Sequence, residues 1–319
     1  MIASNPKVSV IVTVYNLAFF ISEALDSVLT QDYDNLEVVV ADDASTDGSQ
    51  EIIKKYLIKY PNKIKLILNE SNQGVTANSN TAFFACSGEL IAILDGDDIY
   101  LPGKIKAQVE KFVQDPEVVL CYHATEIFDS ATNKTIYVTN QNPREYTDSA
   151  EEIIARGGIL TCAVMVRRSA CPPGGFDTRL RDTQDWVFLT EVALKGKVAR
   201  IDRVLCRYRK HGRGASDRTF ELLDQSLRAL EIIIENHPER RDFVEICRQG
   251  KARYIAGEAF RQLNKNLTLA RDFAKQAVEL DPTNIRYRIF LLLTQLKPLA
   301  RISIPLISRM KYIIKRFFL

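Results

Sequence analysis

Several common signature motifs are missing from this chain of 319 residues. Its six cysteines include no C-x-x-C pair, so we expect reduced core cysteines in a cytosolic protein. No apolar run approaches the ~20 residues that a membrane-spanning helix needs. The first seven residues lack the basic and apolar regions of a signal peptide. Neither G-x-G-x-x-G nor G-x-x-x-x-G-K-[ST] occurs, so a phosphate-bearing ligand would not be held by a glycine loop.

Acidic residues are missing from the last part of the chain. Residues 282–319 contain eight basic residues and no acidic one, which leaves 35 basic against 40 acidic residues in positions 1–281. Short apolar runs interrupted by charges and prolines suit an anionic membrane surface better than a bilayer span. We therefore expect the tail to bind such a surface, with partial insertion of residues such as Phe290. The alternative is that these apolar residues complete the protein core.

Alternating strand and helix patterns fill the first part of the chain. Strands are predicted at 8–15, 36–41, 64–68 and 90–94, and helices at 19–29, 50–59 and 77–85. This order is typical of a parallel sheet covered by helices, in which ligands gather at the carboxyl ends of the strands. Further elements are predicted as a helix at 105–114, strands at 118–123, 160–167 and 204–209, a turn-rich stretch at 129–148 and helices from 219 onward.

Three carboxylates follow the strand at 90–94 within four positions, namely Asp95, Asp97 and Asp98. Crowded carboxylates repel one another, so a divalent cation among them would explain the arrangement. Mg²⁺ and Mn²⁺ commonly share one or two carboxylates with substrate phosphates. The alternative is an ordinary β-turn, which Asp and Gly also favour. Residues 43–54 superficially match a calcium loop, but Lys54 stands where that loop needs a glutamate.

Four motifs in order resemble those of the family-2 glycosyltransferases over roughly residues 6–216. They are the opening strand at 8–16, the D-D-x-S-x-D loop at 40–48, the D-x-D element at 95–98, and the segments 175–177 and 184–186. The resemblance implies an α/β fold of the GT-A type, a Rossmann-like and mostly parallel twisted sheet with helices on both faces, followed by a C-terminal α-helical extension. We therefore expect a catalytic domain at 1–216, a helical region at 217–284 and a basic amphipathic tail at 285–319.

The activity that the resemblance implies is inverting, metal-dependent glycosyl transfer. A sugar would move from a UDP-, GDP- or dTDP-sugar to a hydroxyl of a surface-glycan or lipid-linked acceptor, as in polysaccharide biosynthesis. The expected cofactor is Mg²⁺ or Mn²⁺, the expected location is the cytoplasmic face of the cell membrane, and no nucleic-acid partner is expected. A catalytically silent carbohydrate-binding or scaffold protein is the alternative. The Q-x-x-R-W motif of processive synthases and the glycine-rich opening of sugar nucleotidyltransferases are both missing.

The resemblance also assigns roles to individual residues. The base of the donor would be held by stacking on Tyr15 and by hydrogen bonds to Asp42. Asp185 would be the general base for the acceptor hydroxyl. The residues predicted to bind the donor are Thr13, Tyr15, Asp42, Asp95, Asp97 and His211, and the predicted metal ligands are Asp97 and Asp98.

Three of these residues have a structural alternative. Tyr15 could be an interfacial strand residue, Asp185 a first-turn acid stabilised by the helix dipole, and His211 a solvated surface histidine. One position departs from the family pattern, because Ser79 stands where an arginine is common. A cation near the phosphates is thereby lost, and Arg209, Lys210 or Arg213 would have to replace it.

The helical part of the chain has a repeat-like stretch. Residues 252–282 resemble the latter part of a tetratricopeptide repeat, with alanines at 270, 274 and 277 and Pro282 at fitting positions. A single repeat cannot bury its own apolar face. A helical extension with a seam of small residues is therefore the preferred interpretation.

Overall fold

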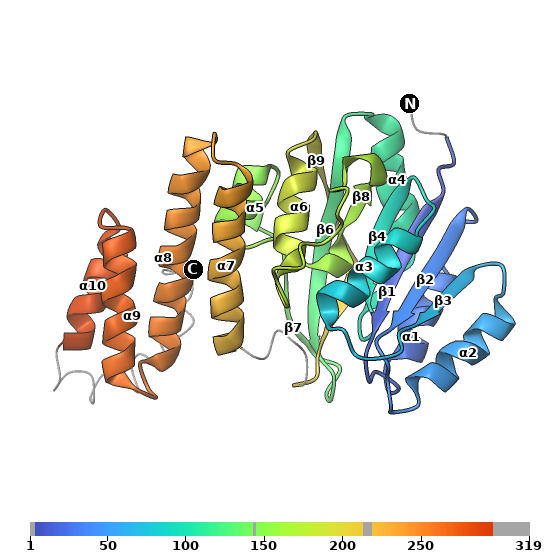
Figure 1. The fold of residues 1–319 in the computed structure, drawn as a ribbon, viewed down its shortest axis with the longest axis horizontal. Helices are drawn as coiled ribbons and strands as arrows, with labels where there is room; N and C mark the ends of the chain where they lie inside the picture. The colour runs from blue at the N-terminus through green and yellow to red at the C-terminus, as the bar shows by residue number, and fades with distance from the viewer. Residues whose placement is uncertain (1–3, 143–144, 213–218, 296–319) are drawn as a thin grey trace. The chain divides into compact units, whose positions relative to one another are not determined.

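A computed structural model describes residues 4–142, 145–212 and 219–295 of the chain (Figure 1). The chain divides into two compact units, residues 1–217 and residues 218–319. The first unit is built on a sheet of mixed direction, and the described part of the second unit is helical.

Four parallel strands form the first half of the sheet, in the order β3-β2-β1-β4. Their bounds are β1 Val8–Val14, β2 Leu36–Asp42, β3 Ile64–Leu68 and β4 Leu90–Asp95. The connecting helices are α1 Ile21–Leu29, α2 Ser49–Lys59 and α3 Val75–Ala85. The apolar side chains of β1 and β4 are buried, which is why these strands read as almost continuous apolar runs. Each buried Val, Leu or Ile side chain contributes about 1.5–3 kcal/mol, so this half is a stable platform for the strand ends.

The second half of the sheet is mixed. Strand β8 is antiparallel to both β4 and β6, β9 is parallel to β6, and β5 and β7 add short antiparallel pairs to β9 and β6. These strands are β5 Ile99–Tyr100, β6 Val118–Asp129, β7 Thr135–Val138, β8 Met165–Arg167 and β9 Lys197–Lys210. The helices of this half are α4 Lys104–Gln114, α5 Ala150–Arg156 and α6 Gln184–Ala193. The GT-A class of fold is confirmed, with parallel pairing dominant only in the first half.

Two predictions of local structure in this half were wrong, and one helix was not predicted. The strand expected at 160–167 is a 3₁₀ turn, η2 Thr161–Ala163, followed by the three residues of β8. The turn-rich stretch 129–148 contains β7, and helix α5 follows it. The start of that helix has the S-x-x-E pattern of a capping box, from Ser149 to Glu152. In the structure the Ser149 hydroxyl accepts a hydrogen bond from the Glu152 amide at 3.2 Å.

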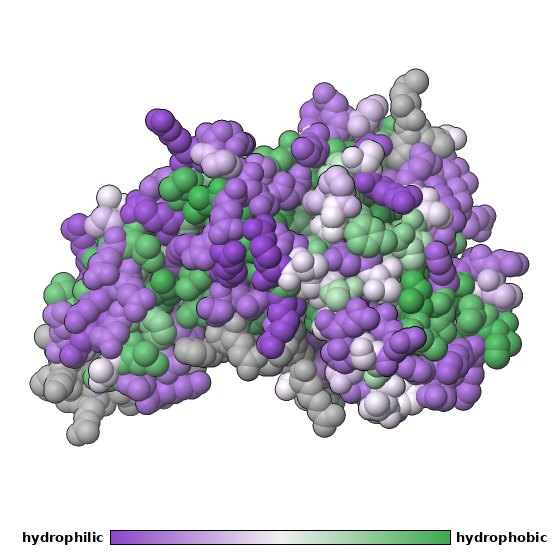
Figure 2. Space-filling view, in the orientation of Figure 1, coloured by the Kyte–Doolittle hydropathy of each residue, from purple (hydrophilic) through white to green (hydrophobic). Residues whose placement is uncertain are grey.

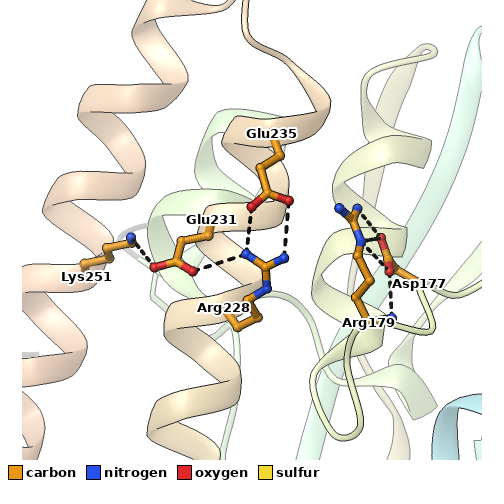
Figure 3. Close-up of polar contacts among 6 residues, drawn as sticks. All are labelled: Asp177, Arg179, Arg228, Glu231, Glu235 and Lys251. Carbon is orange, nitrogen blue, oxygen red and sulfur yellow. Dashed lines mark hydrogen bonds and ion pairs between the residues drawn. The ribbon is translucent and has the colours of Figure 1, made fainter.

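Four helices make up the described part of the second unit. They are α7 Thr219–Asn236, α8 Arg241–Gln262, α9 Leu267–Leu280 and α10 Ile285–Gln295. A seam of buried alanines joins α8 to α9, as the sequence predicted, and includes Ala252, Ala259, Ala270, Ala274 and Ala277. Figure 3 shows Arg228 of α7 between Glu231 and Glu235, while Lys251 of α8 pairs with Glu231 at 3.0 Å. That last pair ties α7 to α8.

The expected membrane tail falls mostly on residues 296–319, which lie outside the described residues. Its first part is α10, where Tyr287 and Phe290 are each 6% exposed and pack against α8 and α9. The prediction that Phe290 inserts into a membrane was therefore wrong, because this ring completes the core of the helical unit. Within the described residues no helix combines the length and the apolar character needed to cross a bilayer.

The surface is largely polar in the view of Figure 2, with an apolar area over α2 at the lower right. Ile58 of that helix is 80% exposed. Single exposed apolar side chains are common on soluble proteins, so this area by itself indicates no partner.

Candidate active site

The site begins where the parallel strands end side by side. In the sheet, Thr13 of β1 lies opposite Asp95 of β4, and Val14 of β1 lies opposite Asp42 of β2. The Thr13 hydroxyl donates to one Asp95 carboxylate oxygen at 2.9 Å, and the Thr161 hydroxyl of η2 donates to the other at 3.1 Å. Burial, reinforced by the charge of Asp97, raises the pKa of Asp95, while the two hydroxyls partly offset that rise. Thr161 is a site residue that the sequence analysis missed.

The turn after β4 carries the other two carboxylates of the D-x-D element. Asp98 is 1% exposed, and its Oδ1 accepts the backbone N–H of Arg209 at 2.9 Å. Its Oδ2 is buried without a hydrogen-bond partner among the described residues. Burial, followed by the charges of Asp97 and Asp95, raises the pKa of Asp98 well above its usual range. This crowding disfavours ionisation in the free protein, and a cation would relieve it.

The structure brings His211 to this turn. Its Nε2 lies 2.9 Å from Asp97 Oδ2, and its ring packs on Phe20 with centroids 4.9 Å apart. The other ring nitrogen, Nδ1, is buried without a hydrogen-bond partner in the described part of the chain. His211 is therefore an ordered part of the acidic site, and the solvated surface alternative is wrong for it.

The carboxylates of the D-D-x-S-x-D loop have different roles, and two of them hold the loop in shape. Asp43 accepts hydrogen bonds from the Asn69 side chain and from the backbone amides of Gln73 and Gly74, so it shapes the loop before α3. Asp47 accepts a hydrogen bond from the amide of Ala18 at 2.9 Å and so joins this loop to the segment between β1 and α1. Both carboxylates are scaffold.

Asp42 differs from these two neighbours. It is fully buried, and its Oδ1 accepts from the Ser45 amide at 2.9 Å and from Gln50 Nε2 at 2.8 Å. Its Oδ2 has no hydrogen-bond partner among the described residues. Tyr15, immediately after β1, is 49% exposed. A free acceptor oxygen and a half-exposed ring at adjacent strand ends match the requirements for holding a nucleobase.

Asp185 lies in the first turn of α6, as the sequence predicted. Burial, followed by the charge of Asp95, raises its pKa to about 6, and backbone amides at the start of the helix oppose the rise. The charge of Asp95 at the end of β4 therefore reaches the first turn of α6. The neighbouring Trp186 fixes the start of α6, since its Nε1–H donates to the Ile153 carbonyl at 2.9 Å.

The segment at 175–177 is a structural tie between α3 and α6. Asn80 of α3 accepts the Phe176 amide at 2.7 Å and donates to its carbonyl at 2.9 Å. The Phe176 ring stacks on Phe188 of α6 with centroids 4.2 Å apart. Figure 3 shows Asp177 paired with Arg179 at 2.6 Å. These contacts position α6, and with it Asp185.

We expect Gly175→Ala to lower the free energy of unfolding by about 1–3 kcal/mol, because its φ is +71° and an added Cβ would collide with the Asn80 side chain. Chemical denaturation measures the loss. The adjacent Gly174→Ala is the control, since that Cβ would enter open space. Equal stability of the two variants would show that the tie between α3 and α6 tolerates a side chain.

The structure shows how Ser79 and the residues that would replace the missing arginine are placed. Ser79 is 7% exposed within α3. Arg209 is held by other protein groups, because its Nε–H donates to the Asp97 carbonyl at 2.7 Å and its guanidinium pairs with Glu23. Lys210 places its Nζ 5.2 Å from the centroid of the Tyr208 ring, and Arg213 lies outside the described residues.

The donor set of the acidic turn fits a hard divalent cation. Carboxylate oxygens suit Mg²⁺ and Mn²⁺. Within the described residues no group of three or more His, Cys, Asp or Glu side chains is arranged to hold a metal ion. Asp97 and Asp98 would therefore supply part of the coordination, with substrate phosphates and water supplying the rest.

Comparison with known families gives one match to a family model. The model described as "Glycosyl transferase family 2" matches residues 9–171. An uncharacterized glycosyltransferase of Nostoc sp. is 34% identical over 212 residues, which are 65% of this chain and 65% of that protein. The match thus spans less than two thirds of the length of this relative.

Two solved structures have a similar fold. The mannosyltransferase PcManGT from Pyrobaculum calidifontis, in complex with GDP-Man and Mn²⁺, is 20% identical with a TM-score of 0.60 over 94% of this chain and 87% of that one. S. aureus TarS 1-349, in complex with UDP-GlcNAc, is 19% identical with a TM-score of 0.61 over 90% of this chain and 89% of that one. At this identity the likeness establishes the fold.

Proposed function

This chain belongs to glycosyl transferase family 2, and from that premise we propose that it is an inverting, metal-dependent glycosyltransferase. It would move a sugar from a nucleoside-diphosphate donor to a hydroxyl of a surface-glycan or lipid-linked acceptor. The observation that carries the proposal is the set of carboxylates at the end of β4, with Asp95 on the strand and Asp97 and Asp98 on the turn after it, whose charge reaches Asp185 at the start of α6. Two similar structures, solved with GDP-Man and with UDP-GlcNAc, support this donor class.

Each half of the sheet would serve one substrate. Asp42 Oδ2 would accept a hydrogen bond from the base, Tyr15 would stack on it, and Thr13 would hold Asp95 in place near the ribose or the metal. Asp97 and Asp98 would hold a divalent cation, which would stabilise the charge that develops on the leaving diphosphate. Asp185 would take the proton of the acceptor hydroxyl as that oxygen attacks the anomeric carbon. A single displacement of this kind inverts the anomeric configuration.

Asp185 suits the role of a general base near neutral pH. A carboxyl with a pKa of about 6 is mostly ionised at pH 7, yet it is a stronger base than an ordinary aspartate. Its position in the first turn of α6 is also that of a helix-dipole acid. The raised pKa favours the catalytic role, because a purely dipole-stabilised acid would have a lowered one.

A panel of UDP-, GDP- and dTDP-sugars, each with Mn²⁺ or with EDTA, tests the proposal. We expect one nucleotide series to raise the melting temperature only when Mn²⁺ is present, and we expect slow release of the free diphosphate. Stabilisation without any release or transfer would instead support the silent carbohydrate-binding alternative. Absence of stabilisation by every donor would refute nucleotide-sugar binding itself.

A further inference from the structure

The end of β9 lies against the acidic turn because of one long-range strand pair. Short strand β5 directly follows Asp98 and pairs with β9, with Tyr100 opposite Cys206 and Ile99 opposite Arg207. This pairing brings Arg209 and His211 to residues that precede them by more than one hundred positions. Both residues lie beyond the paired segment, toward the site.

Arg209 contacts the acidic turn at two points and helix α1 at a third. Its backbone N–H donates to Asp98 Oδ1 at 2.9 Å, and its Nε–H donates to the backbone carbonyl of Asp97 at 2.7 Å. Its Nη2 pairs with Glu23 in the first turn of α1. One arginine therefore joins β9, the acidic turn and α1.

Two aromatic rings enclose the guanidinium. Its Cζ lies 4.9 Å from the centroid of the Phe20 ring and 4.8 Å from that of Phe128. The side chain is only 8% exposed, although that of its partner Glu23 is 56% exposed. Phe20 also packs on the His211 ring, so the same ring orients both residues from the end of β9. A planar group held between two rings has little freedom to turn toward a ligand.

We propose that Arg209 is a positioning residue, which fixes the Asp97–Asp98 turn for metal-dependent binding of a diphosphate without contacting the diphosphate itself. The inference rests on the proposed function, since it concerns the same site. Groups that orient metal ligands through hydrogen bonds commonly change metal affinity by about 10–100-fold when they are replaced. The competing role for Arg209 is direct neutralisation of the phosphates, in place of the arginine missing at Ser79.

A change from arginine to lysine separates these two roles. Lysine keeps the positive charge but lacks the planar fork that reaches the Asp97 carbonyl and fits between the rings. If Arg209 positions the turn, Arg209→Lys should weaken Mn²⁺-dependent binding of UDP or GDP about tenfold or more. If its charge acted directly on the phosphates, most of the affinity should remain.

Arg207→Lys is the matched control, because Arg207 is two residues earlier on β9. Its guanidinium lies 3.9 Å from the same Phe128 ring, and its Nε–H donates to Glu126 at 2.9 Å. The control therefore loses a similar stacked ion pair outside the acidic turn. We expect it to match Arg209→Lys in melting temperature and to keep wild-type nucleotide affinity.

Isothermal titration of UDP and GDP in Mn²⁺, and titration of Mn²⁺ alone by electron paramagnetic resonance, give readouts independent of turnover. Glu23→Gln is a second variant that leaves Arg209 in place. Positioning predicts weaker nucleotide binding for it, whereas direct phosphate contact predicts tighter binding, because the guanidinium is released. Wild-type affinity in Arg209→Lys, or tighter binding by Glu23→Gln, would overturn the inference. A wild-type protein that binds neither nucleotide would overturn the proposed function and the inference together.

Discussion

Replacing Asp185 with asparagine should lower turnover by about 100-fold or more while donor affinity stays near that of the wild type. A general base acts on the acceptor proton, and its usual contribution to rate is of this size. Asparagine keeps the size of the side chain and cannot accept the proton. Single-turnover transfer, together with titration of the donor, separates the two effects.

The pKa of Asp185 adds a second expectation for the wild type. Because the carboxyl must be ionised to act as a base, transfer should fall about tenfold for each pH unit below about 6. The residual activity of Asp185→Asn should not show this fall in rate at low pH. A variant that keeps wild-type turnover, or loses donor affinity as strongly as turnover, would show that Asp185 is structural or donor-binding.

Stability provides the control for this variant. The pKa of Asp185 is higher in the folded protein than in the unfolded chain, so its ionisation favours unfolding. That cost is absent below the unfolded pKa and complete above about pH 6. We therefore expect Asp185→Asn to be at least as stable as the wild type at pH 7. Glu191→Gln, a neutralised acid on the same helix, should keep full activity.

Replacing Asp97 with alanine should weaken binding of UDP or GDP in Mn²⁺ by about 100-fold or more. The effect should exceed that of changing an orienting group, which is about 10–100-fold, because Asp97 would hold the cation itself. Without the cation, the remaining carboxylates of the turn repel the phosphates. Calorimetry of the wild type and of Asp97→Ala, in Mn²⁺ and in EDTA, measures the change.

Asp97→Asn is the sterically matched companion of this variant. Asparagine keeps a side-chain oxygen for the 2.9 Å contact with His211 but removes the charge that a hard cation needs. Both variants should bind nucleotide weakly and about equally in Mn²⁺ and in EDTA. Equal affinity of the wild type and both variants in every condition would rule out a metal role for this residue.

The sequence alone determined the first half of the fold and the location of the site. β-Branched runs and helix-period segments are local signals, and they predicted β1, β2, β3 and β4 with the helices between them. In a parallel sheet the carboxyl ends of the strands must meet, so Thr13, Asp42 and Asp95 were bound to lie together. The seam of small residues in α8 and α9 was also predictable, because the spacing of these residues is a local pattern.

Tertiary structure decided which of the polar residues belong to the site. The sequence of the motif at 40–48 does not distinguish its three carboxylates. In the structure both Asp43 and Asp47 are bound by backbone amides, whereas Oδ2 of Asp42 has no hydrogen-bond partner within the described residues. The roles of Arg209 and His211 depend on the β5–β9 pair, and the place of Phe290 depends on the packing of α10. Periodicity records only which face of an element is buried. The partner of each buried or charged group is set by contacts between residues distant in sequence, which no local pattern contains.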